Sequence, residues 1–433
     1  AMTSSLVGSE MCIRDRNMDV VCDLLCRDGK NAAVGQGLSA DGAKRIDASG
    51  LILAPGLIDL HTHLRDPGFT EKEDILTGCA AAAAGGVTTL CAMPNTKPTC
   101  DTPETIAYIL EKAKNAKARV LPVAAITKGL AGQELTDMEA LKKAGACAFS
   151  DDGVPVATAA LMAEAMREAS KLNVPIFAHT EDQTLSKGGK INEGKVSREL
   201  GVPGIPNAAE DVGTARELSL LITAPENTRL HICHVSTAGS VALIADAKRR
   251  GLSVTAETGP HYFMLNDEML RTKDADYRMN PPLRTKADQE AVLQALVDGI
   301  LDVIATDHAP HTPLEKSDFL SAPNGVIGME TSFCAAYTAL VLTGLMTVSE
   351  LIYRMSTLPA KILGRDLGTL RVGAPADLIL IDEHETWVVD PERLHGKSKN
   401  AVFKGRKLQS KIKMTVYNGE IVFEDEREKN YGV

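Results

Sequence analysis

Two histidines separated by one residue are the first side chains in this sequence with an evident chemical use. His61 and His63 lie in the stretch 57–67, Leu-Ile-Asp-Leu-His-Thr-His-Leu-Arg-Asp-Pro, and Arg65 follows them. The apolar run 57–60, with Pro and Gly on both sides, predicts a buried strand. Because side chains alternate along a strand, all three project from one face, where two imidazoles can bind one metal ion. A lone histidine is more often a hydrogen-bonded core residue, so a metal site requires further ligands.

Further candidate ligands follow other apolar runs along the chain. They are Asp151, Asp152, His179, His231, His234, Asp307, His308 and His311. Four histidines and two aspartates at one place suit two adjacent divalent ions, and one carboxylate must bridge them because close cations need shared negative charge. Imidazole with carboxylate favours zinc, and manganese and cobalt are alternatives. Spacing alone does not choose between Asp151 and Asp152 as the bridge, and we expect His231 to be structural.

The elements that must position these residues alternate regularly. Eight β-branched-rich runs begin near residues 57, 87, 119, 146, 174, 229, 252 and 301, and segments with helical spacing, such as 105–116, 157–172 and 208–221, lie between them. Eight strands alternating with helices over about 310 residues predict an α/β fold, a parallel (β/α)8 barrel. The alternative is a doubly wound open sheet. We favour the barrel because polar residues follow almost every strand, and a barrel brings all strand ends to one mouth.

The two ends of the chain have a β pattern instead. Residues 17–55 hold short apolar stretches separated by Gly and Asp, and residues 366–433 are typical of strands with a hairpin at Asn418-Gly419. We expect the two ends to form one small β-sandwich domain beside a catalytic barrel of residues 56–365. Residues 1–16 have no periodicity and lack the long apolar core of a signal peptide, so we interpret them as a non-native segment.

The composition excludes several classes of function. Of the 433 residues, 44% are hydrophobic and 24% are charged, which is ordinary for a globular protein. The net charge of −10 argues against nucleic-acid binding. No apolar run approaches the roughly 20 residues that span a bilayer. The nine cysteines are scattered and none forms a Cys-x-x-Cys pair, so we expect reduced thiols in a cytoplasmic protein.

Taken in order, the polar motifs of the chain resemble those of the amidohydrolase superfamily, and within it those of the dihydroorotases. They are His61-Thr-His-Leu-Arg-Asp-Pro-Gly, Met93-Pro-Asn-Thr, Ser150-Asp-Asp-Gly, His179-Thr-Glu-Asp, His231-Ile-Cys-His-Val-Ser, Asn280-Pro-Pro-Leu-Arg and Thr306-Asp-His-Ala-Pro-His. Each motif is moderately specific, and the ordered set is highly specific. The resemblance implies a cyclic amide hydrolase that reversibly interconverts N-carbamoyl-L-aspartate and (S)-dihydroorotate in pyrimidine biosynthesis.

The resemblance also implies roles for individual residues. His61, His63 and Asp307 would bind the first zinc ion, His179 and His234 the second, and Asp152 would bridge both. Asp307 would also act as the catalytic base. The substrate would be held by His63, Arg65, Asn95, Asn280, His311, Asn324 and Gly325, with Arg65, Asn95 and His311 on its carboxylate. A planar guanidinium suits a carboxylate because it can donate two parallel hydrogen bonds.

Two other functions compete with this interpretation. Asn324 stands where several bacterial dihydroorotases carry Phe, which brings the sequence nearer to hydantoinases, dihydropyrimidinases and allantoinases. Those relatives usually bridge their ions with a carboxylated lysine, whereas Asp151 and Asp152 favour the aspartate-bridged dihydroorotases. Arg65 would also find no carboxylate on hydantoin or dihydrouracil. The third reading is an inactive dihydroorotase-like scaffold of aspartate carbamoyltransferase, but such proteins typically lose metal ligands. A homodimer and an association with aspartate carbamoyltransferase are further implications of the resemblance.

Overall fold

Eight parallel strands form the centre of the computed structural model, which describes residues 4–8, 12–15, 18–39 and 42–425. In spatial order they are β8 (Leu57–Thr62), β9 (Val87–Ala92), β10 (Arg119–Ala124), β11 (Ala148–Phe149), β12 (Ile176–Ala178), β15 (Leu230–Ile232), β16 (Val254–Thr258) and β17 (Val303–Ile304). The segment after β17 lies beside the end of β8 and closes the ring. There the backbone N–H of His63 donates to the carbonyl of His308 over 2.8 Å. The sheet is therefore a nearly closed barrel, as predicted, and the open-sheet alternative is wrong.

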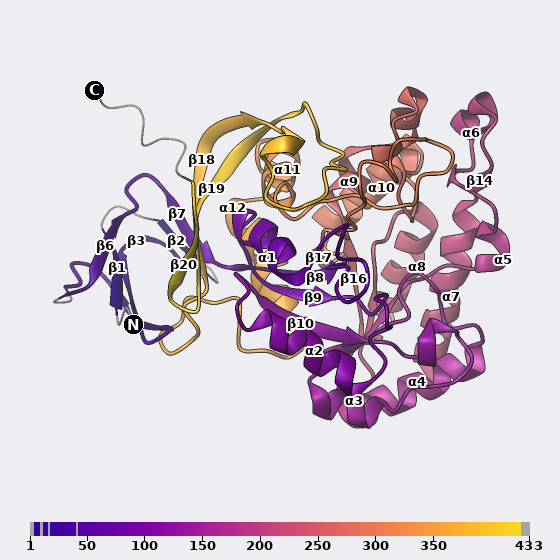
Figure 1. Ribbon diagram of the computed structural model, residues 1–433, viewed down its shortest axis with the longest axis horizontal. Coiled ribbons are helices and arrows are strands. Elements are labelled where there is room, and N and C mark those ends of the chain that lie inside the picture. The colour runs from indigo at the N-terminus through magenta and orange to yellow at the C-terminus, as the bar shows by residue number, and fades with distance from the viewer. Residues whose placement is uncertain (1–3, 9–11, 16–17, 40–41, 426–433) are drawn as a thin grey trace.

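Helices cover the outside of the barrel (Figure 1). They include α1 (Ile75–Ala84), α2 (Pro103–Ala113), α3 (Met138–Ala144), α4 (Ala159–Leu172), α7 (Asn207–Thr223), α8 (Ala238–Arg249), α10 (Lys286–Val297), α11 (Ser332–Ala336), α12 (Val348–Ile352) and α13 (Leu358–Leu363). Helices α2, α4, α8 and α10 each begin after a threonine whose hydroxyl accepts a hydrogen bond from the third helical N–H. This cap satisfies a backbone donor that the helix leaves free. The three helices expected at 105–116, 157–172 and 208–221 correspond to α2, α4 and α7.

Two connections at the carboxyl ends of the strands carry short elements that sequence analysis did not identify. The first holds α5 (Gln183–Ser186), β13 (Ile191–Asn192), α6 (Lys195–Leu200) and β14 (Gly204–Ile205), and the second holds α9 (Pro260–Met264), η2 (Asp267–Thr272) and η3 (Ala275–Tyr277). The buried Arg284 joins the first connection to the barrel. Its guanidinium donates to Asn192 Oδ1 over 3.2 Å, to the carbonyl of Ile205 over 3.0 Å and to Ser236 Oγ over 3.1 Å.

Both ends of the chain contribute to two packed sheets beside the barrel (Figure 1). Within the described residues, one sheet has the order β5 (Lys30–Gly35), β4 (Asp23–Arg27), β1 (Ser4–Gly8), β6 (Lys44–Asp47). The other has the order β20 (Glu420–Glu424), β19 (Lys407–Tyr417), β18 (Leu378–Val388), β7 (Ile52–Pro55), β2 (Cys12–Asp15), β3 (Met18–Val21). Buried apolar side chains of both sheets, among them Leu24, Leu53 and Leu378, form one core between them. The expected β-sandwich beside the barrel is therefore present.

The hairpin at Asn418 and Gly419 joins β19 to β20, and both residues have the positive φ angles, 52° and 80°, that a tight two-residue turn requires. The domain boundaries at residues 55–56 and 365–366 stay predictions. The same holds for the interpretation of residues 1–16 as non-native, although Ser4–Gly8 and Cys12–Asp15 pair in the two sheets as β1 and β2.

Thiols and membrane spans can be checked on the described part of the chain. The cysteines described there are buried, and no disulfide joins any two of them: Cys22, Cys26, Cys79, Cys91, Cys100, Cys147, Cys233 and Cys334. This arrangement agrees with the expectation of reduced thiols. Among the described helices, none is both long enough and apolar enough to cross a membrane.

Candidate metal centre

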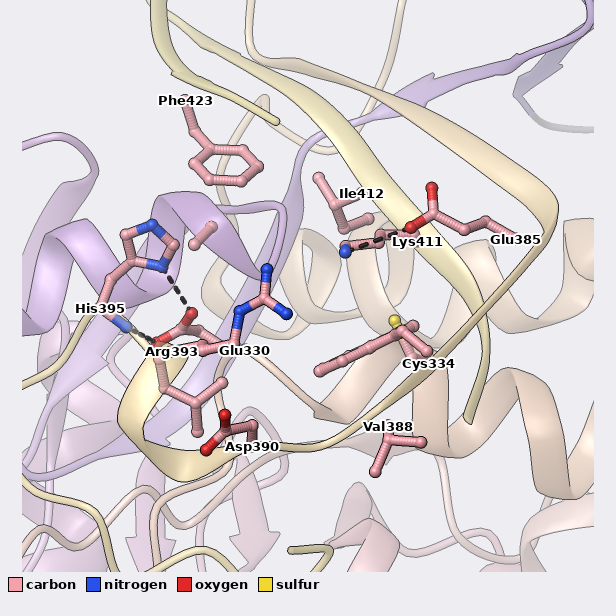
Figure 2. Close-up of a pocket in the computed structure, with 13 residues that line it drawn as sticks. Glu330, Cys334, Glu385, Val388, Asp390, Arg393, His395, Lys411, Ile412 and Phe423 are labelled. Atoms are coloured by element: carbon pink, nitrogen blue, oxygen red, sulfur yellow. Dashed lines mark hydrogen bonds and ion pairs between the residues drawn. The ribbon is translucent and has the colours of Figure 1, made fainter. Parts of the chain in front are cut away.

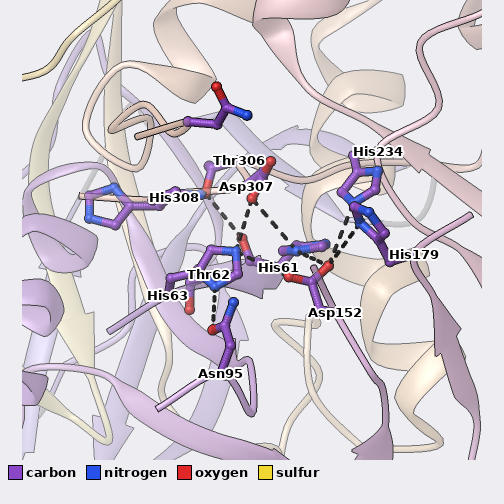
Figure 3. A network of polar contacts seen from close by, with 12 residues as sticks. His61, Thr62, His63, Asn95, Asp152, His179, His234, Thr306, Asp307 and His308 are labelled. Atoms are coloured by element: carbon purple, nitrogen blue, oxygen red, sulfur yellow. Dashed lines mark hydrogen bonds and ion pairs between the residues drawn. The ribbon is translucent and has the colours of Figure 1, made fainter. Parts of the chain in front are cut away.

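The six residues expected to bind metal meet at the mouth of the barrel (Figure 3) and are called here the His–Asp cluster: His61, His63, Asp152, His179, His234 and Asp307. Asp152 lies at its centre. Its Oδ1 is 3.3 Å from His61 Nε2, 3.4 Å from His179 Nδ1 and 3.5 Å from His234 Nε2. Its Oδ2 is 3.5 Å from His63 Nε2. One carboxylate within reach of four imidazoles has the position that a bridge between two ions requires.

Asp307 completes the His–Asp cluster from the segment after β17. Its Oδ1 lies 3.1 Å from His63 Nε2 and 3.6 Å from His61 Nε2. The Asp307 side chain is 13% exposed, more than any other side chain of the cluster, so it faces the open mouth. The backbones of Asp307 and His234 have φ angles of 47° and 35°. Residues other than glycine adopt this region at a cost, and such strain is typical of functional sites.

The carboxylates of the cluster stay ionised. Burial raises the pKa of the Asp152 carboxyl, but the adjacent His61, His179 and His234 outweigh burial and hold this pKa well below its usual range. Burial also raises the pKa of the Asp307 carboxyl, but the neighbouring histidines outweigh burial here too, so this pKa is lowered. Two buried negative charges therefore face four imidazoles, which favours the binding of cations.

The hydrogen bonds of His61 show that the cluster fits a metal ion. Its Nδ1 lies 2.7 Å from Glu257 Oε1 and donates to it, so in the neutral imidazole the lone pair is on Nε2. That lone pair faces Asp152 Oδ1, and within the described structure neither atom has a hydrogen-bond partner. Two buried acceptors that face each other are unfavourable unless a positive charge, either a proton or a metal ion, lies between them. Imidazole nitrogens and carboxylate oxygens are also the ligands that zinc accepts.

The two neighbouring aspartates after β11 have different surroundings. Asp151 accepts hydrogen bonds from the backbone N–H groups of Ile126 and Thr127 over 2.8 Å and 2.9 Å, and from the Thr127 hydroxyl. Asp151 therefore fixes the loop after β10, whereas Asp152 faces the histidines. The geometry separates two residues that their spacing in the sequence leaves equivalent.

Arg65 and His311 lie beside the cluster. Arg65 Nε donates to the carbonyl of Pro310 over 3.2 Å, and its Nη2 is 3.4 Å from His311 Nε2. His311 Nε2 donates to the carbonyl of Asn324 over 2.9 Å. Burial, together with Arg65 and Lys72, lowers the pKa of His311 to about 3, so this imidazole is neutral. Burial also lowers the pKa of Arg65 to about 10, which leaves the guanidinium charged at neutral pH.

Of the asparagines expected to bind substrate, Asn95 contacts a histidine of the cluster and Asn280 contacts a carboxylate behind it. Asn95 Oδ1 accepts a hydrogen bond from His63 Nδ1 over 2.8 Å. Asn280 Nδ2 donates to Glu181 Oε2 over 3.5 Å. Both side chains are at the barrel mouth, and their contacts with the substrate stay predictions.

Asn324 and Gly325 shape the chain beside His311. Asn324 Oδ1 accepts a hydrogen bond from Arg278 Nη2 over 3.1 Å. This amide therefore helps to fix the loop that contains Asn324 and Gly325. Gly325 has a φ of 144°, and a Cβ built there would lie 2.6 Å from the carbonyl oxygen of Ala309. Only glycine fits this close approach without a shift of the backbone. The substrate contacts of both residues also stay predictions.

A cavity of about 510 Å³ lies away from the cluster, between α1, the segment at α11 and strands β18 to β20 (Figure 2). Two of its three acidic side chains are already paired: Glu330 lies 2.8 Å from His395 Nδ1, and Glu385 lies 3.2 Å from Lys411 Nζ. It contains none of the expected metal ligands and mixes both charges in its lining. The chemistry of the chain therefore points to the barrel mouth rather than to this cavity.

Comparison with known proteins agrees with this geometry. A Dihydro-orotase-like family model matches residues 50–240, and an Amidohydrolase family model matches residues 152–423. The chain is 46% identical to the dihydroorotase of Citrifermentans bemidjiense over 426 residues, which cover 98% of this chain and 100% of that protein. It is 45% identical to the dihydroorotase of Bacillus cytotoxicus over 409 residues, which cover 94% and 95%. The chain belongs to the dihydroorotase family. It is a hydrolase of cyclic amide bonds within the metal-dependent amidohydrolases.

Solved structures extend the likeness to the whole fold. The L-hydantoinase (dihydropyrimidinase) of Arthrobacter aurescens has a TM-score of 0.87 and 26% identity, over 98% of this chain and 96% of that one. The D-hydantoinase (dihydropyrimidinase) of Thermus sp. has a TM-score of 0.82 and 26% identity, over 97% and 95%. These identities are well below those with the dihydroorotases, so the hydantoinase alternative shares the fold but is the more distant relative.

Two carboxylates that lie behind the histidines were not predicted from the sequence. Glu257 on β16 contacts His61 and also His231 Nε2, over 3.0 Å, and Glu181 Oε2 lies 3.4 Å from His179 Nε2. His231 thus contacts Glu257 rather than the His–Asp cluster. A charged residue inside an apolar strand, as Glu257 is between Ala256 and Thr258, was the signal available in the sequence.

Proposed function

We propose that the protein is a dihydroorotase with a binuclear zinc centre, which reversibly interconverts N-carbamoyl-L-aspartate and (S)-dihydroorotate in pyrimidine biosynthesis. The observation that carries this proposal is the position of Asp152, whose carboxylate lies within 3.5 Å of all four imidazoles. His61, His63 and Asp307 would hold one ion, His179 and His234 the other, and Asp152 both. When bound, the two ions supply a water activated near neutral pH and polarise the amide carbonyl of the substrate.

Asp307 is the residue of the cluster that moves the proton. Its lowered pKa keeps it ionised, and its exposed edge faces the place where a substrate would lie. In ring opening, the carboxylate takes a proton from the attacking water and gives it to the ring nitrogen as the amide bond breaks. In ring closure, the same carboxylate takes a proton from the carbamoyl nitrogen as the C–N bond forms and gives it to the carboxyl oxygen that leaves as water.

Arg65 binds the substrate carboxylate in this proposal. Its guanidinium stays charged at neutral pH, and Nε is already fixed on the carbonyl of Pro310. The Nη groups then remain for the substrate, whereas the charge of the neighbouring Lys72 is paired with Glu315, whose Oε1 lies 2.7 Å from Lys72 Nζ. A charged guanidinium beside a two-metal centre favours an anionic substrate over an uncharged cyclic amide.

A substrate panel tests the reaction. Purified protein loaded with zinc should hydrolyse dihydroorotate at least about tenfold faster, in kcat/KM, than dihydrouracil, hydantoin or allantoin, since a charged hydrogen bond contributes about 1.5–3 kcal/mol. Likeness to the hydantoinase structures supports the alternative, an enzyme for uncharged rings. A preference for hydantoin or allantoin would establish that alternative. Failure of every substrate in a fully metallated protein would favour the inactive scaffold.

Metal content is tested separately. The six converging ligands lead us to expect two zinc ions per chain by elemental analysis after growth with added zinc. A protein that binds a single ion under these conditions would contradict the binuclear centre, whatever its activity.

We also propose that the protein is a cytoplasmic homodimer that associates with aspartate carbamoyltransferase. These assignments follow from membership of the dihydroorotase family. Size-exclusion chromatography with light scattering, alone and after mixing with the carbamoyltransferase, should show a dimer and then a larger complex. A monomer that elutes unchanged in the mixture would contradict both assignments.

A further inference from the structure

A carboxylate buried behind the metal-binding face has no described function. Glu257 lies on β16 with 1% of its surface exposed. Its Oε1 is 2.7 Å from His61 Nδ1, and its Oε2 is 3.0 Å from His231 Nε2. Isolated buried carboxylates are strongly unfavourable. The N–H groups of the two imidazoles compensate the buried charge of Glu257.

The hydrogen bonds determine which ring nitrogen of His61 carries the proton. An ionised carboxylate only accepts, so His61 must donate from Nδ1. In the neutral ring that binds a metal ion, Nε2 then presents its lone pair to the His–Asp cluster, where Asp152 Oδ1 lies 3.3 Å away. His231 donates from Nε2, and its Nδ1 lies 2.8 Å from the hydroxyl of Thr255, which can donate to it. Both nitrogens of His231 have partners and His61 is held through Nδ1, so the orientation of the His61 ring is fixed before any ion binds.

The second pair of cluster histidines has a matching carboxylate. Glu181 Oε2 lies 3.4 Å from His179 Nε2, on the side of the ring away from Asp152. His63, by contrast, is held by the neutral amide of Asn95, 2.8 Å from its Nδ1. Each expected ion thus has one histidine backed by a carboxylate, Glu257 from β16 and Glu181 from the loop after β12.

We propose that Glu257 and Glu181 are positioning residues, each for one ion: Glu257 for the ion held through His61, and Glu181 for the ion held through His179. A carboxylate that accepts from the outer N–H of an imidazole fixes its tautomer and makes its inner nitrogen a stronger electron donor. This inference rests on the two-ion centre of the proposed function.

Glutamine substitutions isolate the effect of the charge. In Glu257→Gln, the amide oxygen still accepts from His61 and the amide N–H can donate to His231 Nε2. His231 then donates from Nδ1 to the Thr255 hydroxyl, which can also accept, so no buried group loses its partner. Glu181→Gln makes the same change of charge at the other ion, and each variant is therefore the matched control for the other.

Single-ion backgrounds separate the two binding steps. His179→Asn should leave the ion on His61, and His61→Asn should leave the ion on His179. In each background, the zinc Kd is measured by competition with a chromophoric chelator, and the visible spectrum is recorded with Co²⁺. In the His179→Asn background, Glu257→Gln should raise the Kd about 10–100-fold and shift the Co²⁺ bands, and Glu181→Gln should change neither. In the His61→Asn background the two variants should exchange their effects.

Equal effects of both substitutions in one background, or no effect of either, would overturn the assignment. The melting temperatures of the metal-free variants should match that of the metal-free parent, because a purely structural role would lower them instead of the affinity. If Glu257→Gln does not fold, the more exposed Glu181 still decides the inference in its own background. A wild-type protein that binds one ion would refute the two-ion function, while the effect of Glu257→Gln on that ion would still test its positioning role.

Discussion

Replacement of Arg65 by methionine tests whether this guanidinium recognises the substrate carboxylate. In the free protein, Arg65 Nε donates to the carbonyl of Pro310, whereas the nearby His311 Nε2 donates to Asn324 and so has no lone pair for the guanidinium. The Nη groups are therefore the part of Arg65 that remains for a ligand. Methionine has a similar length and keeps the packing of the aliphatic stem, so the substitution removes mainly charge and hydrogen bonds.

The size of the effect follows from this geometry. One charged hydrogen bond contributes about 1.5–3 kcal/mol, which corresponds to a loss of roughly 10–200-fold in kcat/KM for dihydroorotate. Arg65→Lys keeps the charge but not the fork of donors, so its loss should be intermediate. The pKa of about 10 keeps Arg65 charged through neutral pH, and the effect should therefore be constant between pH 6 and pH 8.

The assay compares two substrates. Hydrolysis of dihydroorotate is followed by the loss of its ultraviolet absorbance, and hydrolysis of dihydrouracil, which lacks the carboxylate, is followed in parallel. We expect Arg65→Met to reduce only the former, with zinc content unchanged. Equal losses for both substrates would show that Arg65 supports the structure of the mouth, and the reasoning from its free Nη groups would be wrong.

Three further predictions concern the cluster and its loop. Asp152→Ala should lose zinc and activity together, whereas Asp151→Asn should keep both ions. Wild-type apoprotein should recover activity with zinc in bicarbonate-free buffer, and a need for bicarbonate would indicate a carboxylated lysine instead. Asp307→Asn should lower kcat by about 10²–10⁴-fold, the usual range for loss of a general base, and near-full activity with both ions bound would remove it from the mechanism. Gly325→Ala should cost about 1–3 kcal/mol of stability, measured by urea unfolding, because its φ is positive and its Cβ would meet the carbonyl of Ala309; an unchanged midpoint would show that the loop adapts.

The barrel was predictable because its signals are local. Each strand is a short apolar run, and each neighbouring helix has its own periodicity and often its own threonine cap. The alternation of strands and helices can therefore be predicted from each segment separately. The His-x-His spacing at His61 and His63 is equally local, since alternation along one strand places both rings on one face. The pairing of the two chain ends in one sandwich followed from the same kind of pattern.

Only the tertiary structure distinguished residues whose positions depend on loops or on distant strands. Asp151 and Asp152 are adjacent in the sequence, and the turn after β11 alone decides that one binds the backbone near Thr127 while the other faces the histidines. Glu257 contacts His61 across 196 residues of chain, a pairing that no local pattern encodes. The sequence by itself therefore determined the architecture and the ligand types, because strands and helices follow from short-range periodicity. The direction of each side chain at the mouth was decided by loop geometry and by packing between strands far apart in the chain.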